Sequence, residues 1–222
     1  MKRITTICLL IVSATSLFAQ GRIDQEIADR YQKEAGDHAA LYYAPIENPF
    51  SQARWINHPY WEQLDCVEGE VCFDRVVYKK VMMRFNIATQ RLIVAMPNSK
   101  ILVTPDMAKV DYFVIFGKRF EEKDGRFMCV EYRSGNLTLW HEKVKMKGTD
   151  VQKDNRSYSS YNEIDRFYVV DGQTEFQIKK AKDIAKHYPI YKKMILKHIK
   201  NSYIQDKYEL MAETLEYLTS IK

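Results

Sequence analysis

Long apolar runs are scarce in this sequence. After its first twenty residues the chain has no run that approaches the roughly 20 apolar residues a membrane-spanning helix needs. It also contains no internal repeat and no low-complexity tract. We therefore expect no transmembrane segment beyond residue 20. The part that follows is long enough to bury a real core without disulfides or bound metals.

Signatures of catalysis are absent as well. The chain has no Gly-x-Ser-x-Gly nucleophile elbow and no His, Cys, Asp or Glu pair at zinc-type spacing. A cysteine nucleophile needs a nearby histidine held by a third polar group. The histidines beyond the leader are instead scattered over different predicted elements: His38, His58, His141, His187 and His198. We expect no catalytic residue, no cofactor and no metal ion.

Cysteine is rare and its count is awkward for pairing. Of four cysteines, Cys8 lies in the leader, so Cys66, Cys72 and Cys129 remain, and at least one of these three has no partner within the chain. If Glu68–Glu70 forms a three-residue hairpin loop, Cys66 and Cys72 face each other within disulfide reach. A loop one residue longer or shorter places them on opposite faces and forbids the bond. Cys129 lies in an apolar stretch, as a buried thiol does.

Charge of one sign is not in large excess. The whole chain carries a net charge of +5, of which Lys2 and Arg3 in the leader supply two. The remaining +3 is too small to indicate nucleic acid, and basic–aromatic strand motifs are missing. We therefore expect no nucleic-acid partner.

The first nineteen residues have the parts of a secretory signal. Lys2 and Arg3 form a positive start, an apolar run from Cys8 extends to Phe18, and Ala19 is a small residue suited to cleavage. We predict a signal peptide over 1–19, cleavage after Ala19, and export to the periplasm or the outer-membrane or extracellular side. An uncleaved N-terminal anchor is the alternative.

The remaining residues, 20–222, predict a single α+β domain. Residues 23–35 have apolar side chains every four positions and predict a helix. Alternating patterns then mark a β-rich region over 65–178, and apolar stripes at helical spacing mark a helical region over 179–222. Strands followed by helices favour an antiparallel sheet or a partly closed barrel, packed with two or three C-terminal helices.

Two hairpins are specified by their turn residues. Ser134-Gly135-Asn136 separates two strands, and Asp171-Gly172 is the strongest hairpin signal in the chain. In the second strand of the first hairpin the apolar face switches near His141, which predicts a β-bulge there. Val110–Phe116 is apolar on both faces, which is typical of a central strand.

An irregular aromatic segment precedes the strands. Trp55, Tyr60 and Trp61 surround His58 and Pro59. Flat rings suit sugars, so Trp55, His58, Tyr60 and Trp61 form a candidate ligand surface for a glycan. The favoured interpretation is that the rings fold back and seal one end of the sheet.

The start of the helical region is rich in lysine. Residues 179–200 hold eight lysines against the single acid Asp183. Such a cluster suits anionic lipid headgroups or an acidic polysaccharide. The favoured interpretation is a solvated face whose side-chain stems cover the edge of the core.

Several segments resemble uncharacterised secreted proteins of Bacteroidetes-type bacteria. The run Tyr78–Ile87, continued at Arg91–Val94, is similar to a recurrent segment of that group, as are Val110–Phe113 and Gly117–Phe120. These motifs are apolar strand patterns without active-site residues, so the resemblance implies secretion but transfers no functional residue. We expect an exported, non-enzymatic envelope protein that binds or scaffolds an envelope protein, a glycan or a lipid. The alternatives are a carbohydrate- or lipid-binding module and an enzyme of unidentified type.

Overall fold

The computed structural model of the chain describes residues 25–48 and 50–222. The predicted signal peptide and its cleavage position after Ala19 lie outside these residues. The predicted N-terminal helix is described over 25–35, where its apolar side chains recur at four-residue spacing. It is followed by the short 3-10 helices η1 (Gly36–His38), η2 (Ala40–Tyr42) and η3 (Gln52–Arg54).

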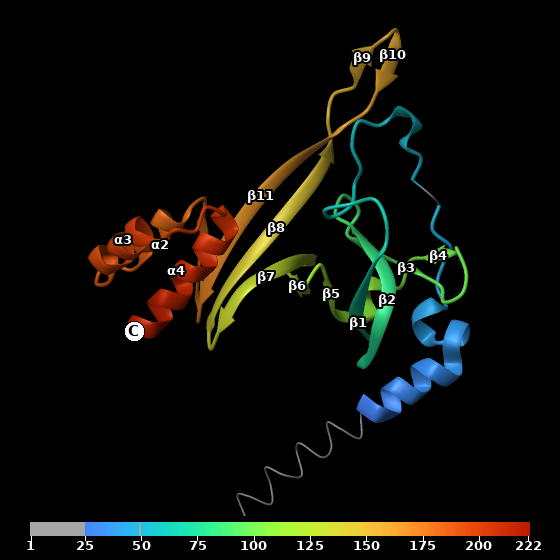
Figure 1. Cartoon of the computed structure of the whole chain (residues 1–222), viewed down its shortest axis with the longest axis horizontal. Helices are drawn as coiled ribbons and strands as arrows, with labels where there is room; N and C mark the ends of the chain where they lie inside the picture. Colours follow the sequence, from blue (N-terminus) through green and yellow to red (C-terminus); the bar gives the residue numbers. More distant parts are fainter. Residues whose placement is uncertain (1–24, 49) are drawn as a thin grey trace, which may run out of the picture.

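A large antiparallel sheet occupies the middle of the molecule (Figure 1). Ten described strands pair in the order β12-β11-β8-β7-β6-β5-β1-β2-β3-β4, so most sequence neighbours are also spatial neighbours. The sheet is open, so the architecture is α+β with an antiparallel sheet and not a barrel. The strands are β1 (Val67–Phe73), β2 (Val76–Asn86), β3 (Arg91–Ala95), β4 (Leu102–Val103), β5 (Val110–Ile115), β6 (Lys118–Lys123), β7 (Arg126–Ser134), β8 (Leu137–Lys147), β11 (Tyr161–Asp171) and β12 (Thr174–Ile178). A further 3-10 helix, η4 (Met107–Lys109), precedes β5.

Tight two-residue turns connect several of these strands. At Phe116-Gly117 and Asp124-Gly125 both residues have positive φ, as a type I′ turn requires. The predicted hairpins at 134–136 and 171–172 are confirmed, because Ser134 pairs with Leu137 and Asp171 pairs with Thr174. Val110–Ile115 lies inside the sheet, between β1 and β6, as its apolar pattern predicted.

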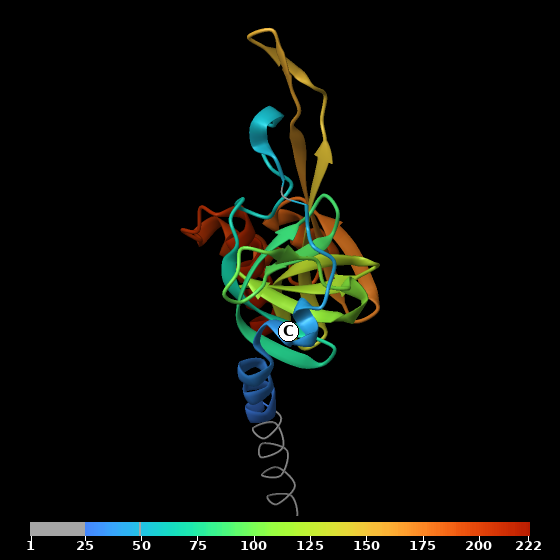
Figure 2. The ribbon, with the colours of Figure 1, turned by 90° about the vertical axis from the view of Figure 1, so that its right-hand side faces the viewer.

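Strands β8 and β11 form the longest ladder and extend into an arm. Their pairing is unbroken from Leu137, which pairs with Asp171, to Lys147, which pairs with Tyr161. Beyond it, β9 (Val151–Lys153) and β10 (Arg156–Tyr158) form a small separate hairpin. Figures 1 and 2 show this arm projecting at one end of the molecule, away from the helix at 25–35.

The sheet supports two hydrophobic cores. The first lies among β1–β7 and includes the packed rings of Phe85, Phe113 and Phe120, with Phe113 and Phe120 stacked at 4.8 Å. The second lies between β7, β8, β11 and β12 and the C-terminal helices α2 (Ala181–His187), α3 (Lys192–Asn201) and α4 (Lys207–Ile221). Three C-terminal helices agree with the prediction, and their buried stripes include Ile184, Ile195 and Leu215.

Candidate functional site

The aromatic segment seals the first core. Tyr60 and Trp61 are 1% and 2% exposed. The ring of Trp61 lies 4.8 Å from Phe120, and Tyr60 pairs with Asn86 at the end of β2. Trp55 and His58 are half-buried, and Trp55 stacks on Tyr161 at 4.7 Å. The four residues therefore do not form a common exposed surface: Tyr60 and Trp61 pack against the core, as the favoured interpretation of the sequence predicted.

Cys66 and Cys72 do not form the disulfide that the hairpin hypothesis required. They lie along the same extended segment, because β1 runs unbroken through Glu68–Glu70 and the turn falls at Asp74-Arg75. Six residues of strand span roughly 20 Å, far beyond the roughly 7 Å limit between bonded Cα atoms. Both thiols are free.

Gly69 caused that misassignment. It suggested a turn, but it marks a close approach between strands, because a Cβ atom there would collide with the carbonyl oxygen of Val114 on β5. The prediction of a disulfide is therefore wrong for a physical reason: glycine serves here to bring β1 and β5 together.

None of the three thiols has the environment of a nucleophile. Burial raises the pKa of Cys66, and burial with a hydrogen bond to Asp111 raises the pKa of Cys72 to about 11. Cys129 is fully buried, as predicted, and burial raises its pKa further. Reactive cysteines need a lowered pKa, so these thiols favour structural roles.

A buried group of charged and polar side chains lies where the two cores meet. We call it the His141 cluster; its members are Lys118 on β6, Glu131 on β7, His141 on β8, Asp165 on β11 and Tyr208 on α4. The Nδ1 atom of His141 lies 2.9 Å from Glu131, and its Nε2 atom lies 2.6 Å from Asp165. Lys118 donates to Glu131 over 2.6 Å, and the hydroxyl of Tyr208 donates to Asp165 over 3.0 Å.

The imidazole of His141 is enclosed on its faces as well as its edges. It is 2% exposed, stacks on Phe167 at 4.4 Å and on Tyr208 at 5.0 Å, and meets Trp61 edge to face at 5.4 Å. Trp61 belongs to the first core and Phe167 to the second. His141 therefore joins the two cores.

The carboxylates of the cluster stay ionised despite their burial. Burial alone would raise the pKa of Glu131, but hydrogen bonds from His141 and Lys118 outweigh it and lower the pKa to about 2. For Asp165, burial is likewise outweighed by hydrogen bonds from His141 and Tyr208, which lower its pKa. Both ring nitrogens of His141 are thus engaged by carboxylates.

The His141 cluster anchors the helices on the sheet. Tyr208 lies in the first turn of α4, which packs on β7 and contacts both α2 and α3. Buried charges cost free energy unless their hydrogen bonds are complete, and here each carboxylate has two hydrogen-bonding partners. The cluster thus fixes the position of the C-terminal helices on the sheet. In the described residues, those of the cluster included, no three His, Cys, Asp or Glu side chains are arranged to hold a metal ion.

The outer side of α2 and α3 carries a dense row of basic side chains, which we call the lysine surface. All eight of its lysines are exposed: Lys179, Lys180, Lys182, Lys186, Lys192, Lys193, Lys197 and Lys200. Of these eight lysines, only Lys186 forms an ion pair with another described residue, at 2.6 Å from Asp183. That hydrogen bond lowers the pKa of Asp183, whose carboxylate also accepts from the backbone N–H of Lys179 and Lys180. Asp183, the one acid in the region, is therefore already paired and does not neutralise the other lysines.

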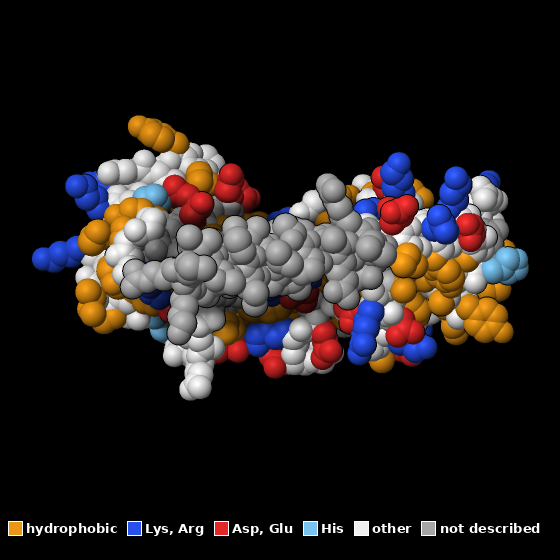
Figure 3. Space-filling view, turned by 90° about the horizontal axis from the view of Figure 1, so that it is seen from below, with side chains coloured by type: hydrophobic (Ala, Val, Ile, Leu, Met, Phe, Trp, Pro, Cys, Tyr) orange, Lys and Arg blue, Asp and Glu red, His pale blue; other side chains and the backbone are white. Residues whose placement is uncertain are grey.

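Exposed apolar side chains stand among these lysines. Ile190, between α2 and α3, is 88% exposed, and Tyr203, after α3, is 95% exposed. Leu196 follows Lys192 and precedes Lys200 at four-residue spacing, so the three lie in one row of α3. At the helical end of the molecule, on the left in Figure 3, basic and hydrophobic side chains project side by side. An amphipathic, cationic surface of this kind is typical of interfacial helices.

Comparison with known proteins adds no assignment. No protein-family model, no curated protein and no solved structure gives a significant match to the chain. In the part of the chain that the structure describes, no helix has the length and apolar character to cross a membrane. The function therefore has to be argued from the geometry of the surface and the cluster.

The sequence pointed to the lysine surface but not to the His141 cluster. The lysines were visible as a run of charge, although their lack of acidic partners was not. The His141 cluster was missed because its residues lie on four strands and one helix. The apolar switch near His141 was the only local signal of it. The bulge predicted in β8 is not found there, since β8 pairs with β11 without a break; the bulge lies on the neighbouring strand β7, at Glu131.

Proposed function

We propose that this chain is an exported, non-enzymatic envelope protein whose lysine surface binds anionic membranes. The observation that carries the proposal is the set of seven exposed lysines without ion pairs that share the segment 179–203 with the exposed side chains of Ile190, Leu196 and Tyr203. Unpaired lysines near an anionic leaflet each contribute about 1 kcal/mol to binding. The apolar side chains add burial in the headgroup region, and such paired signals give stable association.

Lipid is favoured over an acidic polysaccharide as the partner. A polysaccharide would use the charges and the ring of Tyr203 but would leave the aliphatic side chain of Ile190 in water. A membrane interface takes up both kinds of side chain, since an aliphatic or aromatic group inserts at the level of the headgroups. The glycan-binding and enzyme alternatives from the sequence have less support: Tyr60 and Trp61 of the aromatic segment are buried, and both nitrogens of His141 are engaged.

Vesicle co-sedimentation tests the proposal. We expect the purified protein to bind vesicles of phosphatidylcholine mixed with phosphatidylglycerol, to bind phosphatidylcholine alone weakly, and to detach as salt rises, because screening shortens the range of the lysine charges. The triple variant Lys192→Gln, Lys193→Gln, Lys197→Gln should bind about a hundredfold more weakly, at about 1 kcal/mol for each lost charge.

The matched control removes three lysines elsewhere. Lys100, Lys109 and Lys153 are exposed, lie outside the helical region and form no ion pair within the described residues. Their simultaneous change to glutamine alters the net charge equally and should leave binding intact. Equal loss in both triple variants would reduce the effect to net charge. Tighter binding to dextran sulfate than to the anionic vesicles would make a polysaccharide the partner.

Export needs its own measurement. Fractionation of the producing bacterium should place the protein outside the cytoplasm, with an N-terminus at Gln20. An intact N-terminus at Met1 in the cytoplasmic fraction would refute both the export and the envelope assignment.

A further inference from the structure

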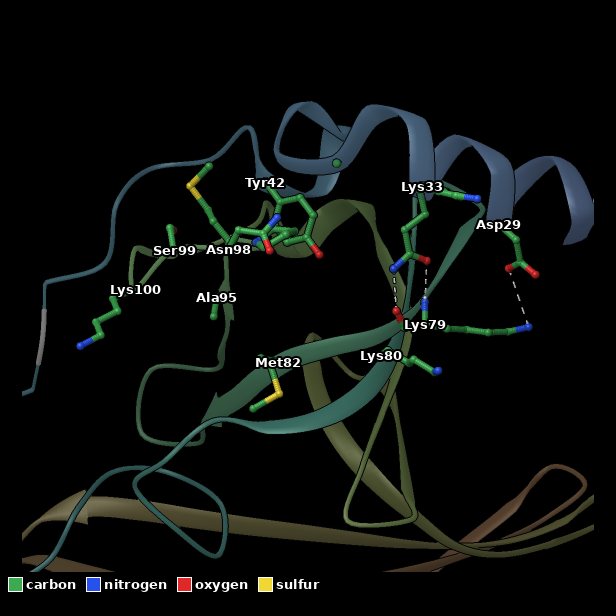
Figure 4. Close-up of a pocket in the computed structure, with 14 residues that line it drawn as sticks. Asp29, Lys33, Tyr42, Lys79, Lys80, Met82, Ala95, Asn98, Ser99 and Lys100 are labelled. Atoms are coloured by element: carbon green, nitrogen blue, oxygen red, sulfur yellow. Dashed lines mark hydrogen bonds and ion pairs between the residues drawn. The ribbon is translucent and has the colours of Figure 1, made fainter.

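A groove of about 1110 Å³ lies at the opposite end of the molecule from the lysine surface, beneath the helix at 25–35 (Figure 4). The helix forms its roof, strand β2 forms its floor, and the end of β3 with the following loop closes one side. Its volume is slightly above the roughly 300–1,000 Å³ typical of sites that hold small molecules. The groove shares no residue with the His141 cluster or the lysine surface.

The groove exists because one edge of β2 is only partly paired. On the edge away from β1, strand β3 pairs with β2 only over Met83–Asn86, so along the first half of β2 that edge faces the helix instead of another strand. Gln32 on the helix takes over part of the missing pairing. Its amide donates to the carbonyl of Lys79 over 2.6 Å and accepts from the N–H of Lys79 over 3.0 Å. The contact fixes roof to floor at one end and leaves the rest of the groove open.

A bulge in β2 directs two consecutive lysines toward this end. The register between β1 and β2 shifts between Gly69 and Val71, opposite Lys79 and Lys80. Neighbouring residues of a regular strand point to opposite faces, yet both lysines line the groove. Lys80 reaches this position with φ of 55°, a left-handed conformation that a lysine rarely adopts. Backbone strain of this kind is concentrated at functional sites.

The groove changes character along its length. Figure 4 shows Lys33, Lys79 and Lys80 toward one end, Met82, Tyr42 and Ala95 in the middle, and the polar residues Asn98, Ser99 and Lys100 toward the far end. Asp29 pairs with Lys79 at 3.9 Å, so the three lysines still outnumber the acid at the first end. In the middle Met82 is 43% exposed although it belongs to a strand, and a methionine floor adapts to flexible chains.

We propose that this groove binds a single-chain anionic amphiphile. The anionic headgroup lies among Lys33, Lys79 and Lys80, and the alkyl chain lies along Met82 and Ala95. A fatty acid and an alkyl phosphate share this chemistry. An added peptide strand fits less well, because Gln32 already holds the backbone groups of Lys79 that such a strand would need.

Isothermal titration calorimetry of the purified protein, with each ligand below its micelle concentration, tests the proposal. The anionic probes are dodecanoate and dodecyl phosphate. The uncharged probe is dodecyl maltoside, and the probes without a chain are acetate and inorganic phosphate. We expect the two anionic amphiphiles to bind at least tenfold more tightly than all three others, and the tighter of the two identifies the headgroup.

Variants locate the binding in the groove. Lys79→Gln with Lys80→Gln should weaken both anionic amphiphiles at least tenfold. Met82→Glu should do the same through the chain, by placing a charge on the floor. The control Lys109→Gln with Lys153→Gln should bind as the unchanged protein does. Circular dichroism should show native helix and strand content in each variant; the bonds of Gln32 use only the backbone of Lys79 and so survive the change.

Three outcomes would overturn the inference. They are equal affinity for dodecyl maltoside, equal affinity for inorganic phosphate, and no difference between the groove variants and the control. The result is independent of the membrane proposal. The triple variant of Lys192, Lys193 and Lys197 should still bind dodecanoate fully, while the groove variants should still bind anionic vesicles.

Discussion

Glu131 and His141 lie on adjacent strands without being partners in the ladder, yet their side chains meet at 2.9 Å. The ladder pairs Cys129 with His141 and Val130 with Trp140, then resumes at Tyr132 with Leu139, so Glu131 is the extra residue of a β-bulge. A bulge redirects a side chain that regular pairing would place elsewhere. Here it delivers a carboxylate to a histidine at the junction of the two cores.

This arrangement predicts a large cost for removing the histidine. In His141→Ala, Glu131 and Asp165 lose a shared donor while remaining largely buried. Removing one partner of a buried ion pair typically costs 3–5 kcal/mol, and we expect about 3 kcal/mol here because Lys118 and Tyr208 still donate. Urea unfolding measures the change. His38→Ala, at an exposed histidine, is the matched control and should lie within about 0.5 kcal/mol of the unchanged protein.

The same cluster predicts how stability depends on acid. The pKa of Glu131 is about 2 in the folded protein against an ordinary 4.5, so between these values the unfolded chain binds more protons. The stabilisation is therefore complete above about pH 4.5 and is lost as the pH falls toward 2. At 1.36 kcal/mol per pKa unit, the shift corresponds to about 3 kcal/mol.

Unfolding of Glu131→Gln across this pH range tests the assignment. The variant should be less stable at neutral pH, and its stability should fall less steeply below pH 4.5. Glu68→Gln changes an exposed carboxylate and should keep the slope of the unchanged protein. If the slopes of Glu131→Gln and the unchanged protein coincide, Glu131 does not carry the acid sensitivity.

The parts of the fold that sequence predicted are those with local signals. The turn at Asp171-Gly172 and the apolar stripe through Ile184 and Ile195 each depend on residues close together in the chain. The strand order itself was not predicted, although tight turns join most described neighbours in the sheet.

What sequence could not predict depends on pairs of distant segments. The groove needs Gln32 to meet Lys79, and the cluster needs Asp165 to meet Tyr208. Neither contact has a local pattern, because the partners are brought together only when the sheet and the helices are complete. Gly69 illustrates the opposite error, in which a local signal for a turn was overridden by the close packing of β1 on β5.

The separation of Cys66 and Cys72 along one extended segment predicts that no disulfide joins them. Without any reductant, the denatured protein should react with a thiol reagent at Cys66, Cys72 and Cys129. In the folded protein Cys66 should react first, because it is only half-buried, and Cys129 last, because it is fully buried and its pKa is raised. Mass spectrometry of the alkylated peptides assigns each site. Cys66→Ser provides the control: it should leave the reactivity of Cys72 unchanged, whereas release of a new thiol at Cys72 would show that the two had been bonded.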